Sequence, residues 1–159
     1  MTLQKPLGYI LGQTMRVYRN RINSVLKESQ IELGIDQFLI LLTLNARDDL
    51  TQQDLAHHLQ KDKSIILRQI NALLEKRYVV RLPDKDDKRK KNLILTQKGS
   101  DTLQQAIDLG KQLSEELLAG ISTDDLAVFE NVMLKIQQNG GFNEDDGHSC
   151  FKQPNTQNE

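Results

Sequence analysis

Residues 79–96 constrain the fold of this chain more than any other segment, because two short β-prone runs there flank a loop that is almost entirely charged. The runs Val79–Leu82 and Leu93–Leu95 predict an antiparallel hairpin, which is too small to be stable alone and must lean on a helical core. A stiff finger with positive charge at its tip suits an acidic polymer such as a phosphate backbone. The alternative is a solvated turn whose lysines keep the sheet edge from pairing with other chains. The cationic residues of the loop are Lys85, Lys88, Arg89, Lys90 and Lys91.

The distribution of charge favours the first interpretation, although the chain of 159 residues has a net charge of −1. Residues 61–91 include eleven Lys or Arg against five Asp or Glu, whereas the remainder includes ten against seventeen. This asymmetry predicts a basic contact surface on an otherwise acidic body.

Length and cysteine content bound the class of protein. The chain is long enough for one domain with a sizeable core. Its single cysteine, Cys150, excludes an internal disulfide framework and favours a reducing compartment. The N-terminus lacks the apolar stretch of a signal peptide, and no apolar run approaches the length of a membrane span. We therefore expect a soluble, cytoplasmic protein with no membrane partner.

Helical periodicity runs through most of the remaining sequence. Apolar residues recur with helical spacing from Pro6, which suits a first-turn position, to about Ser29. Gly34 ends the connector that follows. We expect Asp36 to cap a short helix that is apolar nearly all round and therefore buried.

Two short helices in quick succession come next. Thr51–Asp54 resembles a capping box at the start of the first helix, and Asp62 suits the N-cap of a second helix that runs through Lys76. The spacing of Ile66 and Ile70 directs them to the core. Two short helices joined by a tight turn and followed by a hairpin are typical of a winged helix-turn-helix.

Two longer helices complete the predicted fold. Thr96 can cap one that extends to about Ala119, and Ser122 with Asp125 makes an approximate capping box for the last, which Gly140–Gly141 stops. The polar tail, residues 140–159, is predicted to be disordered. The expected fold class is mainly α with a small β-hairpin wing (α+β), a winged helix-turn-helix with long N- and C-terminal helices.

The second helix of the helix-turn-helix presents a polar face opposite its core side. In this motif the second helix enters the major groove and contacts base edges. Arg and Asn match the hydrogen-bonding patterns of guanine and adenine, while Lys and Ser suit phosphate or mixed contacts. The alternative is an ordinary solvated face. The candidate contacts are Lys63, Ser64, Leu67, Arg68 and Asn71.

These segments together resemble the MarR family of bacterial transcription regulators. The resemblance lies in residues 62–81, in the wing segment 81–89 and in Leu95-Thr96-Gln97-Lys98-Gly99. It implies one domain over residues 1–139, with a DNA-binding lobe at about 36–96 and dimerisation helices at about 6–30 and 97–139. It also implies a homodimer on pseudo-palindromic double-stranded DNA, because two-fold symmetry sets two recognition helices one DNA turn apart. The alternative for the apolar stripes of these helices is that they complete the core of a monomer.

The resemblance implies roles for individual residues. Arg89 at the wing tip would enter the minor groove, which attracts guanidinium groups where it is narrow. Asp87 would orient the wing by pairing with a nearby arginine such as Arg81, and Arg68 would lie on the recognition helix.

Two positions depart from the family pattern. Arg77 stands where glycine is usual, and a left-handed non-glycine residue costs about 1 kcal/mol or more. We therefore expect the turn there to close differently and Arg77 to add a phosphate contact. Leu67 stands where threonine is frequent, so base preference is not transferable; it could touch a thymine methyl group or simply pack.

The family often binds small aromatic or anionic effectors in a crevice beside the dimer helices. The simpler interpretation of each candidate is a core or surface residue. The candidates are Tyr9, Met15, Arg16, Tyr18 and Phe38.

Cofactor chemistry has little support in the sequence. Peroxide sensing needs a reactive, positioned cysteine, and Cys150 lies in the predicted tail. His57 and His58 are neighbours on a helix and point about 100° apart, so we expect no metal site and no cofactor. No nucleophile–base pair or phosphate loop predicts an enzyme.

Two functions therefore compete. The first is a dimeric, sequence-specific DNA-binding transcriptional regulator, a ligand-responsive repressor. The second is a helical protein-interaction module or adaptor whose winged domain does not bind DNA specifically. The operator, the target genes, the effector and the direction of regulation are not encoded in these patterns.

Overall fold

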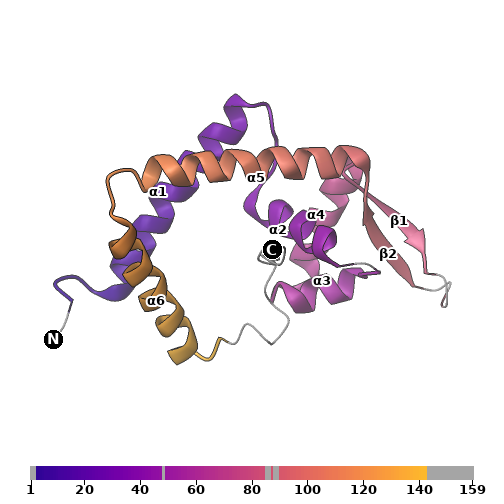
Figure 1. The fold of residues 1–159 in the computed structure, drawn as a ribbon. Coiled ribbons are helices and arrows are strands. Elements are labelled where there is room, and N and C mark those ends of the chain that lie inside the picture. Colours follow the sequence, from indigo (N-terminus) through magenta and orange to yellow (C-terminus); the bar gives the residue numbers. More distant parts are fainter. Residues whose placement is uncertain (1–2, 48, 85–86, 88–89, 143–159) are drawn as a thin grey trace, which may run out of the picture.

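A computed structural model describes residues 3–47, 49–84, 87 and 90–142. In this part of the chain six helices accompany a two-stranded antiparallel hairpin, which confirms the predicted fold class. Figure 1 shows the hairpin and three short helices gathered at one end, α1 and α6 at the other, and α5 spanning the two. The elements are α1 (Leu7–Glu28), α2 (Ile35–Ala46), α3 (Gln52–His58), α4 (Lys63–Glu75), β1 (Val79–Pro83), β2 (Lys91–Leu95), α5 (Gln97–Leu117) and α6 (Thr123–Asn139).

The hairpin is slightly longer than predicted, and it does not stand alone. Its register pairs Val79 with Leu95 at the base and Pro83 with Lys91 at the far end. The segment before α3 lies against β2, where the Leu93 N–H donates to the Leu50 carbonyl at 2.9 Å. This contact ties the hairpin to the helix-turn-helix, as expected for a sheet too small to fold independently.

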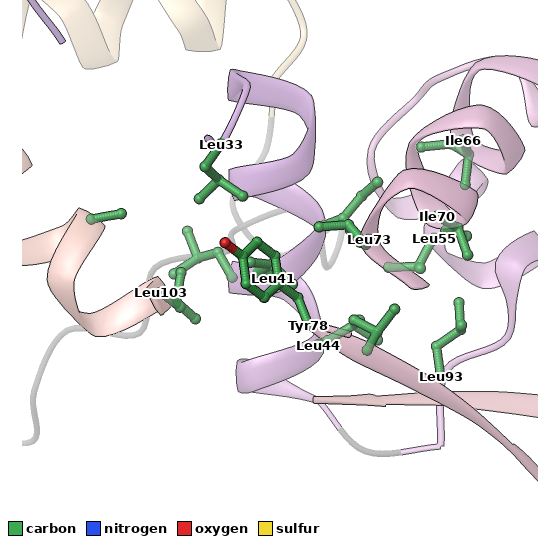
Figure 2. Close-up of a cluster of buried hydrophobic side chains, with 14 of the residues drawn as sticks. Leu33, Leu41, Leu44, Leu55, Ile66, Ile70, Leu73, Tyr78, Leu93 and Leu103 are labelled. Atoms are coloured by element: carbon green, nitrogen blue, oxygen red, sulfur yellow. The ribbon is translucent and has the colours of Figure 1, made fainter. Parts of the chain in front are cut away.

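The core of the lobe forms where α2, α3 and α4 meet the base of the hairpin. Figure 2 shows side chains from all of these elements converging, together with Leu103 of α5. Each such side chain contributes about 1.5–3 kcal/mol when fully buried. The predictions that Ile66 and Ile70 of α4 face the core and that α2 is buried are confirmed. The residues without any exposed surface are Ile40, Leu41, Leu55, Ile70 and Leu73.

Side-chain caps start three helices as predicted. The hydroxyl oxygen of Thr51 accepts the Asp54 N–H, and Asp54 Oδ2 in turn accepts the Thr51 N–H at 2.8 Å. Thr96 caps α5 through the Gly99 N–H at 3.0 Å. Ser122 caps α6 by accepting a hydrogen bond from the Asp125 N–H. Each cap satisfies an N–H group that the first turn leaves unpaired.

Other helix starts differ from prediction in detail. Pro6 is the N-cap of α1 and not a first-turn residue, because its ψ of 138° is extended. Gly34 is the N-cap of α2, and the predicted cap, Asp36, lies in the first turn. There its carboxylate forms an ion pair with Lys61 at 3.3 Å, in the turn of the helix-turn-helix. Asp62 is the N-cap of α4 as predicted, but its side chain makes no capping hydrogen bond.

The turn after α4 closes in the left-handed conformation, contrary to our expectation. Arg77 has a φ of +59°. Its N–H donates to the Leu74 carbonyl, and the Tyr78 N–H reaches back to Leu73 at 2.9 Å, which completes a Schellman motif. The Thr96 hydroxyl also donates to the Arg77 carbonyl at 2.7 Å. These bonds and the burial of Tyr78 offset the strain of a residue with a Cβ atom at this position.

The glycine of the Leu-Thr-x-x-Gly segment has a clear physical reason. A Cβ atom on Gly99 would lie 2.0 Å from the carbonyl oxygen of Tyr78. The start of α5 therefore packs directly against the backbone at the base of the hairpin. At its other end α5 reaches α1, where Arg21 and Glu116 form an exposed ion pair. No helix in the described ranges is long and apolar enough to cross a membrane.

Candidate nucleic-acid interface

The outer face of α4 carries the side chains predicted to contact DNA. Because α4 turns its apolar side to the core, with Ile66 1% exposed, the opposite side faces solvent. Leu67 keeps 41% of its surface exposed, which places an apolar side chain amid polar ones. The exposed polar residues of this face are Lys63, Ser64, Arg68 and Asn71.

The wing projects beside this face, and its loop is closed by hydrogen bonds across its base. The Asp84 N–H donates to the Lys90 carbonyl at 3.1 Å, and the Lys90 N–H donates to the Asp87 carbonyl at 2.8 Å. Asp84 Oδ1 accepts the Asp87 N–H at 2.9 Å. Lys90, at the end of the loop, and Lys91, at the start of β2, are exposed. The other predicted contacts of the loop, Lys85, Lys88 and Arg89, lie outside the described residues.

A cavity of about 660 Å³ opens between the start of α3, the outer face of α4 and the wing. It brings together residues from Thr51 to Leu93, which are 42 positions apart in the sequence. The wing contributes three cations to its lining, and the single carboxylate is that of Asp54. The cavity is lined by Thr51, Gln52, Gln53, Asp54, Leu67, Arg81, Lys90, Lys91 and Leu93.

The Asp54 carboxylate is already committed to the capping box. Hydrogen bonds from the Thr51 side chain and backbone lower the pKa of Asp54 against an opposing effect of burial, with His58 and Lys90 lowering it further. Asp54 therefore stays ionised at neutral pH. Three cations against one carboxylate leave the cavity with a positive balance, which suits an anionic ligand.

Arg81 links the wing to the recognition helix. Its guanidinium donates to Asn71 Oδ1 at 3.3 Å, whereas the sequence predicts a pairing with Asp87. Arg81 therefore lies on the hairpin face that is directed toward α4, and the pairing of Asp87 with a nearby arginine stays a prediction. Arg77, at the end of α4, is exposed.

Comparisons with known proteins match this geometry. Residues 33–91, which contain α2–α4 and most of the hairpin, match the family model described as MarR family. The multiple antibiotic resistance protein MarR of Escherichia coli, like that of Salmonella typhimurium, is 27% identical over 132 residues, covering 82% of this chain and 90% of the relative. The reduced form of E. coli MarR superposes with a TM-score of 0.73 at 26% identity, over 85% of this chain and 98% of the other. Residues 33–91 thus match a MarR family domain, and the chain is similar to MarR over 82% of its length.

A further structural relative shows the same fold at lower identity. The transcriptional repressor CouR, bound to a 23-mer DNA duplex, superposes with a TM-score of 0.73 at 24% identity, over 82% of this chain and 92% of that one. Members of the MarR family are transcriptional regulators and not enzymes, and the winged helix-turn-helix is their DNA-binding element.

The residues predicted to contact an effector are spread over two helices of this chain. Tyr9, Met15 and Arg16 are exposed on α1, and Tyr18 is half-buried there. Phe38, on α2, packs against the core of the lobe. Their role in binding an effector stays a prediction.

The histidines give no sign of a metal centre in the described part of the chain. His57 and His58 lie at the end of α3 with ring centroids 6.0 Å apart. No group of three or more His, Cys, Asp or Glu residues is clustered within the described ranges. Cys150 and His148 lie outside them.

Sequence reasoning missed the residues that hold the base of the wing. Asn92 is only 4% exposed, and its Nδ2 donates to Asp84 Oδ2 at 2.8 Å. Asp84 follows Pro83 and is a usual turn residue, so its place in the loop had a sequence signal. The burial of Asn92 had none, because it depends on the segment before α3 crossing the hairpin.

Proposed function

We propose that this protein is a dimeric, sequence-specific DNA-binding transcriptional regulator and acts as a ligand-responsive repressor. The observation that carries the proposal is the cavity between the start of α3, the outer face of α4 and the wing. It joins a polar helix face to three cations on one side of the molecule. A groove of this charge accepts a duplex backbone while the helix beside it reaches base edges.

The roles within the groove follow from side-chain chemistry. Arg68 and Lys63 are free to reach guanine edges or phosphates from α4, and Ser64 suits a phosphate. Asn71 is held by Arg81, so an adenine contact by Asn71 requires that hydrogen bond to open. Leu67 offers an apolar contact for a thymine methyl group.

Phosphate contacts come from the cations around the groove. Lys90 and Lys91 extend from the wing, Arg81 lies at the cavity wall, and Arg77 is exposed at the end of α4. By family resemblance, Arg89 enters the minor groove. Each such contact releases counterions, so affinity should fall steeply with salt.

The dimer is supported by the unpartnered apolar surface at the other end of the molecule. α6 buries none of its residues within this single chain. Since exposed apolar surface of this extent is costly in a monomer, a second copy is the occupant that two-fold pairing of a DNA-binding protein supplies. The exposed apolar residues of α1 and α6 include Leu7, Tyr9, Met15, Val17, Val128, Phe129 and Val132.

Two-fold symmetry implies a pseudo-palindromic operator. The regulatory ligand is proposed from family resemblance, as a small aromatic or anionic molecule near Tyr9, Met15, Arg16, Tyr18 and Phe38. Binding there would change the relation between the α1–α6 end and the lobe.

Selection of bound fragments from a random DNA pool tests the function directly. We expect an enriched inverted repeat, and weaker binding to it by about tenfold or more for Arg68→Ala, because a base contact is lost. Lys111→Ala, which removes an exposed cation from α5, is the matched control and should bind normally. A stable dimer that enriches no sequence would favour the adaptor alternative.

A further inference from the structure

One buried polar side chain lies where three segments of the lobe meet. Asn92 of β2 is 4% exposed. Its Nδ2 donates to Asp84 Oδ2 at 2.8 Å and to Asp49 Oδ1 at 3.3 Å. Asp84 starts the wing loop, and Asp49 lies in the connection between α2 and α3. A single amide therefore joins the wing to the framework that supports the helix-turn-helix.

The hydrogen bonds continue from Asp84 into the wing. The second carboxylate oxygen of Asp84 accepts the Asp87 N–H, and the Asp84 N–H donates to the Lys90 carbonyl. Asp84 thus fixes the start of the loop through its carboxylate and contacts Lys90, at the end of the loop, through its backbone N–H. Lys90 and its neighbour Lys91 line the cavity beside α4.

The other end of the amide shows that this side chain is not optimised for stability. Asn92 Oδ1 is buried and has no hydrogen-bond partner in the described part of the chain. A reversed amide would bring that oxygen against two carboxylates, so the observed orientation is the favourable one. A buried acceptor without a partner costs free energy, and an apolar residue of similar size would avoid that cost. The two hydrogen bonds from Nδ2 offset that cost, so the contribution of Asn92 lies in the segments that these bonds join.

We infer that Asn92 is a positioning residue for the wing. By holding Asp84 against the α2–α3 connection, it directs Lys90 and Lys91 toward the groove beside the recognition helix. This inference rests on the proposed function, because its consequence is felt in DNA binding.

The first test replaces the amide by an apolar side chain of similar size. Asn92→Leu should still fold, with a modestly lower melting temperature than the wild type, because two carboxylates lose the donor that they share. It should weaken binding to the selected operator about tenfold, and the salt dependence should become shallower because wing contacts are lost. In footprinting, minor-groove protection at the wing positions should disappear while major-groove protection by α4 persists. Ile94→Ala, an exposed position on the same strand, is the matched control and should bind like the wild type.

The second test first adds a carboxylate at position 92 and then reverses the hydrogen bond with a double variant that keeps the net charge. Asn92→Asp should weaken binding more than Asn92→Leu, because three carboxylates then meet at the base of the wing. The double variant D84N/N92D places an amide donor at position 84 and the acceptor at position 92. It should bind better than Asn92→Asp but less tightly than the wild type, because the hydrogen bond between positions 84 and 92 is restored while Asp49 still faces a carboxylate at position 92.

The outcomes separate this inference from the proposed function. A wild-type protein that selects no DNA sequence overturns the function itself. If the wild type binds and Asn92→Leu binds equally well with the same footprint, the positioning role is wrong. If Asn92→Asp does not fold, the double variant provides the test. A folded double variant that recovers no operator affinity also contradicts the inference.

Discussion

The two ends of this molecule differ in whether their apolar residues are buried within the chain. In the lobe, α2, α3 and α4 bury side chains completely against one another, so that Ile40, Leu55 and Ile70 have no exposed surface. At the other end α6 buries nothing, and Phe129 is 58% exposed. Both ends show helical apolar periodicity in the sequence, so the pattern alone does not say whether the partner surface lies within the chain. The lobe buries its apolar residues within a single copy, whereas the α1–α6 end leaves them exposed and, in the proposed dimer, supplies half of the interface.

The largest effect should come from a cavity in the lobe. Ile70→Ala should lower the free energy of unfolding by about 2–5 kcal/mol, because the buried side chain leaves a void. The loss, measured by urea denaturation, should not depend on protein concentration. Val128→Ala, an equally apolar truncation on exposed α6, should act only through the dimer equilibrium and vanish on dilution. Equal, concentration-independent losses in both variants would erase the distinction between the two ends.

Charge on α6 should break the interface and leave the lobe intact. Phe129→Asp should give a monomer in sedimentation, with a helical circular-dichroism signal close to that of the wild type. Operator affinity should fall about 100-fold, which corresponds to about 2.7 kcal/mol, because one recognition helix contacts too little DNA. Asn131→Asp adds the same charge to the same helix and serves as the control. A Phe129→Asp variant that remains dimeric would move the interface away from α6.

The α3 cap should have a smaller, pH-dependent effect confined to the lobe. Thr51→Ala should cost about 1 kcal/mol at neutral pH, because it removes the hydroxyl bonds to the Asp54 N–H and carboxylate and leaves only the bond from the backbone N–H of residue 51. These bonds lower the folded-state pKa of Asp54 from its ordinary value of 3.8, so their contribution is present above that pH. The difference between wild type and variant should therefore shrink as the pH falls below about 4. Thermal unfolding between about pH 2.5 and about pH 7 checks the trend, and a difference that grows in acid would contradict the assignment.

The smallest effect should be a gain of stability at the end of α4. Arg77→Gly should stabilise the lobe by about 1 kcal/mol, since glycine adopts the left-handed conformation without a Cβ penalty. Arg77→Ala keeps the penalty and removes the guanidinium, so it separates the two properties. Both variants should bind DNA more weakly if Arg77 contacts phosphate. Equal stabilities for the Gly and Ala variants would show that the turn carries no strain.

Local signals predicted most of the fold, and tertiary contacts account for what they missed. The caps at Thr51, Thr96 and Ser122 and the inward direction of Ile66 follow from patterns a few residues long. The left-handed Arg77 did not follow, because Thr96 and Tyr78 enforce it from the hairpin side. In the candidate site, the exposed face of α4 was predictable from helical spacing.

The base of the wing was not predictable in the same way. Asn92, Asp84 and Asp49 come together across more than forty residues, and the pairing of Arg81 with Asn71 depends on which hairpin face meets α4. Polar residues of this kind look like ordinary surface residues until the segments around them are placed.

Because Gly99 packs closely against the Tyr78 backbone, a rotation of α5 about this contact would move the far end of the helix. The 21 residues of α5 extend for about 31 Å, from the fixed contact where the wing begins to the far end beside α1. A tilt of about 10° at that contact would displace the far end sideways by about 5 Å, a distance similar to the pitch of one helical turn. In the proposed dimer, small rotations of α5 would thus control the distance between the two recognition helices. A small displacement near α1 would be enough to make that distance differ from one turn of the duplex.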